Sequence, residues 1–349
     1  MAPRCRFSGS EPARVLLLAL AAALPAAAGQ VAHYAPGTVN IRDAFVPDPG
    51  TYVQLYVPFS HSGEFHDAQG NAVHAVTVNS GGGTPARLNV NVNANILTLN
   101  PAVQWVASWK ILGARYGAVI APSFGNSNAS TAANDEFGAS SASGGSAALS
   151  AGDLFLQPLW LGWTLEHWEF AASYGVYAPT GKYNVETTTL TDLQGRTVRL
   201  RGAAADSVGL GFWEHQFQGA VGWYPSPDKR TAFCATGTYE LNGNKRFEDL
   251  TPGSYFTLNW GVSRYVSLKG EELLWEFGPA GFLSWQTEHD RGADAQFKAL
   301  SSVSGAGFQT GLTYAPWGAF LDLQYSREFL AKARAQGETY TLSMARKIF

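Results

Sequence analysis

Four places in the sequence set a histidine beside acidic side chains, the residue types that hold metal ions or transfer protons. They are Glu64 with His66 and Asp67, Glu166 with His167, Glu214 with His215, and Glu288 with His289 and Asp290. Adjacent side chains on a β-strand point to opposite faces, so Glu166–His167 and Glu214–His215 need not cooperate. The other two groups fall in expected loops, where a solvated charge cluster is the common case. None of the four is a strong candidate for a site.

A hydrolase embedded in a membrane barrel would need a serine and a histidine on one outward face. His215 falls on the apolar face of its segment, but no serine on a strand can be paired with it. The sequence also contains no Walker-type phosphate loop, no strand–GxGxxG–helix unit and no Cys/His set with zinc spacing. We therefore expect a non-enzyme without catalytic residues, metal or cofactor, and keep the hydrolase as an alternative.

The segments that must position these side chains are predicted to be β-strands, because apolar and polar residues alternate along them. In residues 273–285, Trp275, Phe277, Leu283 and Trp285 fall on one face. Similar alternation occurs in residues 231–241, 256–266 and 319–326. About 14 strands can be counted; because the one at residues 72–79 is the weakest, 12 is also possible.

The connectors between these strands alternate in length. Short connectors occur at residues 112–114, 165–166, 226–228, 269–270 and 316–318, and long ones at 125–151, 179–205, 242–254 and 288–303. This alternation predicts an all-β, transmembrane, antiparallel up-and-down barrel. We expect residues 125–151, rich in serine, alanine and glycine, to form a flexible loop.

Aromatic spacing favours a membrane barrel over a soluble periplasmic β-protein, which stays open as an alternative. Trp275 and Trp285 lie ten residues apart on one face, and so do Trp213 and Trp223. A membrane-crossing strand has about 9–11 residues, so these tryptophans are expected to form the two membrane girdles. The parity of the apolar residues changes at Phe212, which predicts a β-bulge before Trp213.

The opposite face of these strands is small and polar, as expected for a lumen. The candidate lumen-lining or substrate-path residues are Glu214, Gln216, Gln218, Thr236, Thr238, Glu240, Glu276, Asp322 and Gln324. Carboxylates and amides in a pore set its selectivity by charge and hydrogen bonding. The same residues could instead fill the barrel by satisfying one another, and both roles stay open.

The two ends of the chain indicate export. Residues 1–28 combine three arginines, an apolar run and small residues at 26 and 28, which predicts a cleaved signal peptide. Residues 29–48 are expected to form a periplasmic segment that could plug the lumen, and residues 49–349 the barrel. Charged residues make up only 15% of the chain, and its net charge is −3, so nucleic acid is not an expected partner.

Several blocks of sequence carry a family resemblance. They are HYAPG at 33–37, PGTY at 49–52, GDLFLQPLWLGW at 152–163, YGVYAPTGKYN at 174–184, GLGFWEHQFQGA at 209–220 and DLTPGSYFTLNWGVS at 249–263. On these blocks the chain resembles the outer-membrane proteins of the putative MetA-pathway of phenol degradation family. Membership implies an outer-membrane β-barrel linked to uptake of aromatic or other poorly soluble compounds. It implies no agreed set of site residues.

We therefore predict a barrel in the bacterial outer membrane, with both termini on the periplasmic side. Its expected function is that of a channel for small, poorly soluble compounds, aromatic ones among them. A structural or ligand-holding barrel without an open pore is the first alternative. The expected partners are outer-membrane lipid, a small hydrophobic or aromatic solute and, through the C-terminal strand that ends in Phe349, the barrel-assembly machinery.

Overall fold

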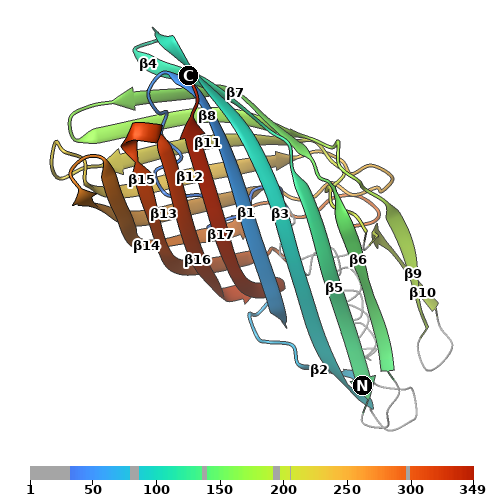
Figure 1. Ribbon diagram of the computed structural model, residues 1–349. Coiled ribbons are helices and arrows are strands. Elements are labelled where there is room, and N and C mark those ends of the chain that lie inside the picture. Colours follow the sequence, from blue (N-terminus) through green and yellow to red (C-terminus); the bar gives the residue numbers. More distant parts are fainter. Residues whose placement is uncertain (1–31, 79–85, 136–139, 192–196, 205, 296–298) are drawn as a thin grey trace, which may run out of the picture.

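Strand β1 pairs with β3 on one side and with β17 on the other, and this pairing closes the sheet into a barrel (Figure 1). The computed structural model describes residues 32–78, 86–135, 140–191, 197–204, 206–295 and 299–349. The barrel strands, in chain order, are β1 (Gly50–His66), β3 (Ala86–Ile111), β4 (Ala114–Ala121), β7 (Leu154–Thr164), β8 (Trp168–Ala178), β11 (Glu214–Trp223), β12 (Thr231–Asn242), β13 (Tyr255–Lys269), β14 (Leu273–Gln286), β15 (Ser302–Tyr314), β16 (Ala319–Lys332) and β17 (Arg334–Lys347). The predicted antiparallel up-and-down barrel is confirmed, with 12 strands.

Three further strands pair with the barrel sheet: β2 (Ala75–Val78), β5 (Phe124–Asp135) and β6 (Ser140–Ala151). The strands β9 (Val185–Thr191) and β10 (Thr197–Ala203) form a separate two-stranded sheet. The weak candidate at residues 72–79 became β2, which pairs with β3 outside the twelve-strand ring. Twelve strands therefore form the closed ring, the lower of the two predicted counts.

The prediction of a flexible loop at residues 125–151 is wrong, because β5 and β6 occupy most of it. The 26-residue strand β3 pairs first with β5 and then, beyond a break at Pro122, with β4. Without β5, the first half of β3 (residues 88–99) would present unpaired backbone N–H and C=O groups. The backbone of any sequence can pair with such groups. A Ser/Ala/Gly segment gives no apolar alternation, so its sequence did not show this pairing. The predicted long loop at residues 179–205 likewise contains the β9–β10 hairpin.

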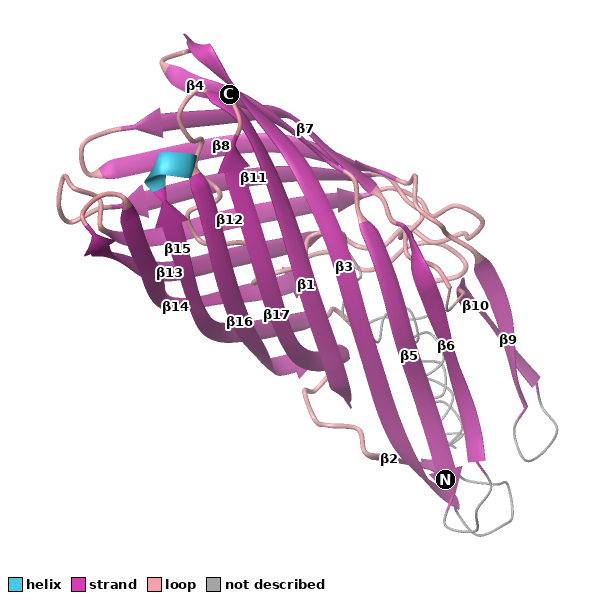
Figure 2. Cartoon of the chain, in the orientation of Figure 1, coloured by secondary structure: helices cyan, strands magenta, loops and turns pink. Residues whose placement is uncertain are grey.

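The predicted short connectors are confirmed, and they all lie on one rim of the barrel, here called the short-turn rim. Leu112 and Gly113 both have positive φ, as does Gly270 in the β13–β14 turn. Gly318 is left-handed at the end of η1 (Ala315–Trp317), the helical turn seen in Figure 2. The opposite, long-loop rim carries residues 179–213, 242–254 and 287–301.

The two faces of the strands differ in exposure as the alternation predicts. The expected girdle residues Trp213, Trp223, Trp275 and Trp285 are all exposed on the outer face, at 54%, 41%, 39% and 38%. The expected β-bulge before Trp213 is wrong, since β11 begins at Glu214. The change of parity arises from a turn at Gly211, whose φ is +80°.

No helix in the described part of the chain is long and apolar enough to cross a membrane. The expected signal peptide, residues 1–28, lies outside the described residues, as do residues 29–31 of the expected plug.

Candidate functional site: the lumen and its N-terminal segment

Residues 32–48 run through the interior of the barrel and are here called the lumen segment. Near the short-turn rim, the Arg42 guanidinium donates to the backbone carbonyls of Lys229 and Arg230 in the β11–β12 turn. At the other end, His33 contacts Glu214, the first residue of β11 on the long-loop side. The segment therefore spans most of the height of the lumen.

His33 anchors the end of the lumen segment near the long-loop rim, where it lies between two carboxylates. Its Nε2 lies 2.8 Å from Asp153 Oδ2, and its Nδ1 lies 2.9 Å from Glu214 Oε2. The ring also stacks on Tyr177, with 4.4 Å between ring centroids. Burial disfavours the charged imidazole, but the charges and hydrogen bonds of Glu214 and Asp153 outweigh it and raise the pKa of His33 to about 9. His33 is therefore a cation at neutral pH.

The middle of the lumen segment is held by polar groups of the wall. The Tyr34 backbone N–H donates to Glu240 Oε1 at 2.8 Å. The Asn40 amide donates to Glu276 Oε2 at 3.3 Å and to Asp322 Oδ1 at 3.2 Å. These bonds satisfy buried carboxyl oxygens of the wall, and leaving such oxygens without a donor would cost free energy.

Arg42 supplies the second positive charge. Its Nε lies 2.7 Å from Ser263 Oγ and 3.0 Å from Glu276 Oε1. Its guanidinium also lies over the Tyr265 ring, 4.5 Å from the centroid. A planar guanidinium can make such in-plane hydrogen bonds and an aromatic contact at once, which a lysine ammonium cannot do as well.

The end of the lumen segment near the short-turn rim packs its apolar side chains into spaces opposite glycines of the wall. A Cβ atom added at Gly261 would lie 2.4 Å from Ile41 Cγ2. A Cβ atom at Gly162 would lie 2.7 Å from Val46. The wall thus accepts these two apolar side chains only because the facing positions lack side chains.

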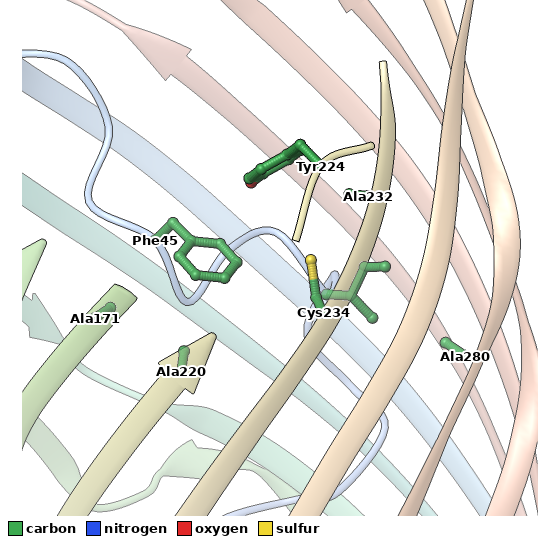
Figure 3. Packing of buried hydrophobic residues seen from close by; sticks show 8 residues of the cluster. Phe45, Ala171, Ala220, Tyr224, Ala232, Cys234 and Ala280 are labelled. Atoms are coloured by element: carbon green, nitrogen blue, oxygen red, sulfur yellow. The ribbon is translucent and has the colours of Figure 1, made fainter. Parts of the chain in front are cut away.

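A buried apolar cluster forms where this end of the lumen segment meets strands β8, β11, β12 and β14. Its members are Ile41, Phe45, Ala171, Ala220, Tyr224, Ala232, Cys234 and Ala280. Figure 3 shows Phe45 of the lumen segment among Ala171, Ala220 and Cys234 of the wall. Cys234 is 6% exposed, so the lumen segment covers the only cysteine that follows the predicted signal peptide.

A cavity of about 330 Å³ lies beside the lumen segment. The segment makes its polar contacts mainly with β11 to β16, and the cavity extends toward the wall of β1, β3, β4 and β7. Its lining joins amide side chains such as Gln157 and Gln216 to the aromatic rings of Phe155, Trp160 and Tyr177. The lumen segment therefore fills part of the barrel and leaves space for a small solute.

Eight of the nine predicted lumen residues divide into two groups. Glu214, Glu240, Glu276 and Asp322 contact the lumen segment. Gln216, Gln218, Thr236 and Gln324 line the cavity. Thr238 is fully buried and accepts a hydrogen bond from Gln218.

Sequence reasoning did not single out His33, Arg42 or Asp153. His33 and Arg42 belong to the expected plug. Two basic side chains on a segment beside an acidic lumen could have indicated that they contact the wall carboxylates. Asp153 lies in the break between β6 and β7, where it also accepts from the backbone N–H groups of Gly181 and Leu210. Nothing in its sequence context marked this role.

The four groups of neighbouring acids and histidines named from the sequence do not form a catalytic arrangement. His215 is exposed on the outer face, where its Nδ1 lies 2.8 Å from Tyr174 Oη, and no described serine hydroxyl contacts it. His66 contacts Glu64 at 3.1 Å near the long-loop rim. Glu166 and Glu288 are exposed. Across the described ranges, no group of three His, Cys, Asp or Glu residues could hold a metal ion.

Comparison with solved structures shows where this architecture occurs. The COG4313 outer membrane channel from Pseudomonas putida F1 is similar with a TM-score of 0.58 and 14% identity, covering 89% of this chain and all of that chain. The β-domain of the Bordetella autotransporter BrkA has a TM-score of 0.49 and 9% identity, covering 86% and 100%. No curated protein matches the sequence.

The family profile described as "Putative MetA-pathway of phenol degradation" matches residues 74–344, which includes β3 to β16 and most of β17. With the twelve-strand barrel, this match identifies a protein of the bacterial outer membrane. The chain belongs to the family of the "Putative MetA-pathway of phenol degradation".

Proposed function

We propose that this barrel is a channel for small, neutral, poorly soluble compounds, aromatic ones among them. The observation that carries this proposal is the cavity of about 330 Å³ between the lumen segment and the wall of β1, β3, β4 and β7. Its volume falls at the lower end of the range of small-molecule sites, and its lining joins aromatic surface to a few amides, as such sites do. The similar channel of known structure and the phenol-degradation family support passage as the role.

Charge supports a neutral or cationic solute over an anion. Five carboxyl groups of the wall contact the lumen segment: Asp153, Glu214, Glu240, Glu276 and Asp322. The segment contributes the cations of His33 and Arg42 and one further carboxyl group, that of Asp43. An excess of carboxyl groups repels anionic solutes.

Influx into proteoliposomes tests the proposal. Purified barrel would be reconstituted into vesicles, and the uptake of a radiolabelled neutral aromatic alcohol would be compared with the uptake of benzoate. We expect faster uptake of the alcohol than in protein-free vesicles, with benzoate unchanged. Equal rates for the alcohol with and without protein would contradict a channel.

A ligand-holding barrel without an open pore is the second candidate. The hydrogen bonds of the lumen segment near the short-turn rim favour it. The Trp160 indole N–H donates to the Ala44 carbonyl at 3.0 Å, and Arg115 donates to the Val46 carbonyl at 3.2 Å. These bonds tie the segment to β4 and β7, across the lumen from the Arg42 contacts. The segment therefore bridges the barrel close to the short-turn rim. Binding without uptake would support this candidate.

A further inference from the structure

The buried carboxylate of Asp153 contacts three donors that come from two separate parts of the molecule. Its side chain is only 3% exposed. Oδ2 accepts from the Leu210 backbone N–H at 2.7 Å and lies 2.8 Å from His33 Nε2, while Oδ1 accepts from the Gly181 backbone N–H at 2.8 Å. His33 belongs to the lumen segment, whereas Gly181 and Leu210 lie on either side of the β9–β10 hairpin. One side chain therefore joins the lumen segment to the long-loop rim.

The two stretches that flank the β9–β10 hairpin, residues 179–184 and 206–212, are here called the mouth segments. Two backbone N–H groups of the second stretch donate to the Lys182 carbonyl of the first, at 2.9 and 3.0 Å. Val208 and Leu210 of the second stretch line the cavity. The mouth segments therefore form one hydrogen-bonded unit that bounds the cavity at the long-loop rim.

The mouth segments pack directly against Asp153 and His33. A Cβ atom added at Gly209 would lie 2.7 Å from Asp153 Oδ1. Phe212, which is 1% exposed, meets the His33 ring edge-on, with 5.0 Å between the ring centroids. Because the backbone at Gly209 and the carboxylate are in contact, neither can shift far without displacing the other.

The charge of Asp153 makes its contacts depend on one another. Among its three donors, only His33 carries a positive charge. A buried carboxylate that loses its cation is unfavourable, and the entry of water relieves this cost. Water would then compete with the N–H groups of Gly181 and Leu210 for the same two oxygens. Release of His33 is therefore expected to loosen the mouth segments, and displacement of the mouth segments is expected to loosen His33.

We propose that Asp153 is a positioning residue that couples the mouth segments to the lumen segment, so that the cavity opens at the long-loop rim when His33 leaves the wall. The proposal rests on the proposed function for its purpose, since such an opening would admit the solute that the channel carries. The coupling itself belongs to the folded barrel, so it can be measured without a solute and without passage across a membrane. Such coupling is reciprocal, so a change made on either side must be seen on the other.

Hydrogen exchange followed by mass spectrometry tests the coupling in the purified full-length protein in detergent. Peptides from residues 32–48 report on the lumen segment. Peptides from residues 206–212 report on the mouth segments, in which the three N–H groups at residues 208–210 are hydrogen-bonded. Peptides from residues 287–295 are the internal control, because the backbone hydrogen bonds of that loop involve neither the lumen segment nor the mouth segments.

His33→Phe changes the lumen side of the coupling. The substitution keeps an aromatic ring at this position but removes the donor to Asp153. Exchange in residues 206–212 is expected to become at least about fivefold faster, which is the lower limit of typical coupling between two sites. Exchange in residues 287–295 is expected to stay the same.

Gly209→Ala changes the mouth side of the coupling. The nearest atoms to the new methyl group belong to Asp153 and Gly181, not to the lumen segment. Exchange in residues 32–48 is nevertheless expected to become at least about fivefold faster. Gly219→Ala is the matched control, because nothing lies within 4 Å of its added carbon, and it should change neither set of peptides.

Local loosening without coupling would give a different result. Faster exchange confined to residues 32–48 in His33→Phe, or confined to residues 206–212 in Gly209→Ala, would overturn the proposal. Equally faster exchange in residues 287–295 would show that the whole barrel is loosened, and it would overturn the proposal as well.

Two further measurements keep the outcomes distinct. Heat-dependent gel mobility shows whether each variant is a folded barrel, and either variant decides the question alone if the other does not fold. Coupled exchange in a protein that gives no solute uptake in vesicles would contradict the channel and leave the coupling in place. Uptake by a protein without coupled exchange would leave the channel in place and overturn the role of Asp153.

Discussion

The Arg42 guanidinium lies 3.0 Å from the Glu276 carboxylate, and the two residues are 234 positions apart in the chain. Glu276 is 1% exposed and belongs to the wall strand β14, whereas Arg42 belongs to the lumen segment. This pair shows that the segment is part of the folded interior and supplies charges that the wall lacks. Four predictions follow from the contacts around it.

Arg42→Ala is expected to loosen the lumen segment. The substitution leaves Glu276 buried without its cation, and breaking one side of a buried ion pair costs about 3–5 kcal/mol. The covered thiol of Cys234 reports the result, because a small thiol reagent should label it faster at fixed pH. The double variant Arg42→Ala/Glu276→Gln should recover part of the protection, since the orphaned charge is gone. Equal labelling of all three proteins would show that the ion pair does not hold the segment.

Gly261→Ala is expected to displace Ile41 from the wall. The new methyl group would meet Ile41 Cγ2 at 2.4 Å, and overpacking of this kind costs about 1–3 kcal/mol. Adding Ile41→Ala should restore the fit and the protection of Cys234. Gly219→Ala on β11, two strands away in the same sheet, is the control, because nothing lies within 4 Å of its added carbon. A larger effect of Gly219→Ala than of Gly261→Ala would contradict the packing argument.

The hold of His33 on the wall should depend on pH. Its folded pKa of about 9 lies above the usual value of 6.5, so protonated His33 stabilises the fold fully below about pH 6.5. That contribution is lost as the pH rises through 9, while Asp153 and Glu214 remain the facing acids and Tyr177 the stacked ring. Thermal unfolding midpoints at pH 6 and pH 10 should therefore differ more for the unchanged protein than for His33→Gln. Identical differences would rule out His33 as the titrating group.

Removal of residues 32–48 should increase the conductance of single barrels in planar bilayers and make it cation-selective. The deletion removes two cations, Arg42 and His33, together with the acids Asp43 and Asp48, and it leaves the wall carboxylates that Arg42 and His33 contacted facing water. Glu276→Gln in the shortened chain should lower the selectivity, whereas Glu166→Gln on the exposed short-turn rim should not. A conductance unchanged by the deletion in a correctly folded barrel would mean that the lumen segment does not limit ion flow.

Alternation along single strands carried enough information to predict the barrel and its inward face. Glu276 and Gln216 were assigned to the lumen because parity alone separates the two faces of a strand. Parity gives no distances between strands, however, so it could not show that Glu276 meets Arg42 while Gln216 faces a cavity. Those contacts depend on the path of the lumen segment, which has no periodic pattern. The β5–β6 hairpin was missed for a related reason, since its pairing depends on the backbone of β3 and not on its own side chains.

The covalent connection between the lumen segment and β1 affects how strongly a solute must bind to replace the segment's contacts with the wall. At the junction, a Cβ atom on Gly50 would lie 2.4 Å from the Phe349 carbonyl oxygen, so the chain turns sharply into the first strand at a fixed point on the barrel. A flexible tether of residues 32–48 has a root-mean-square span of roughly 20 Å. Its contacts are therefore presented to the wall at an effective concentration in about the millimolar range. A solute that used the same contacts would have to compete with a permanently attached segment, whereas a solute that binds beside the segment, in the cavity, would not.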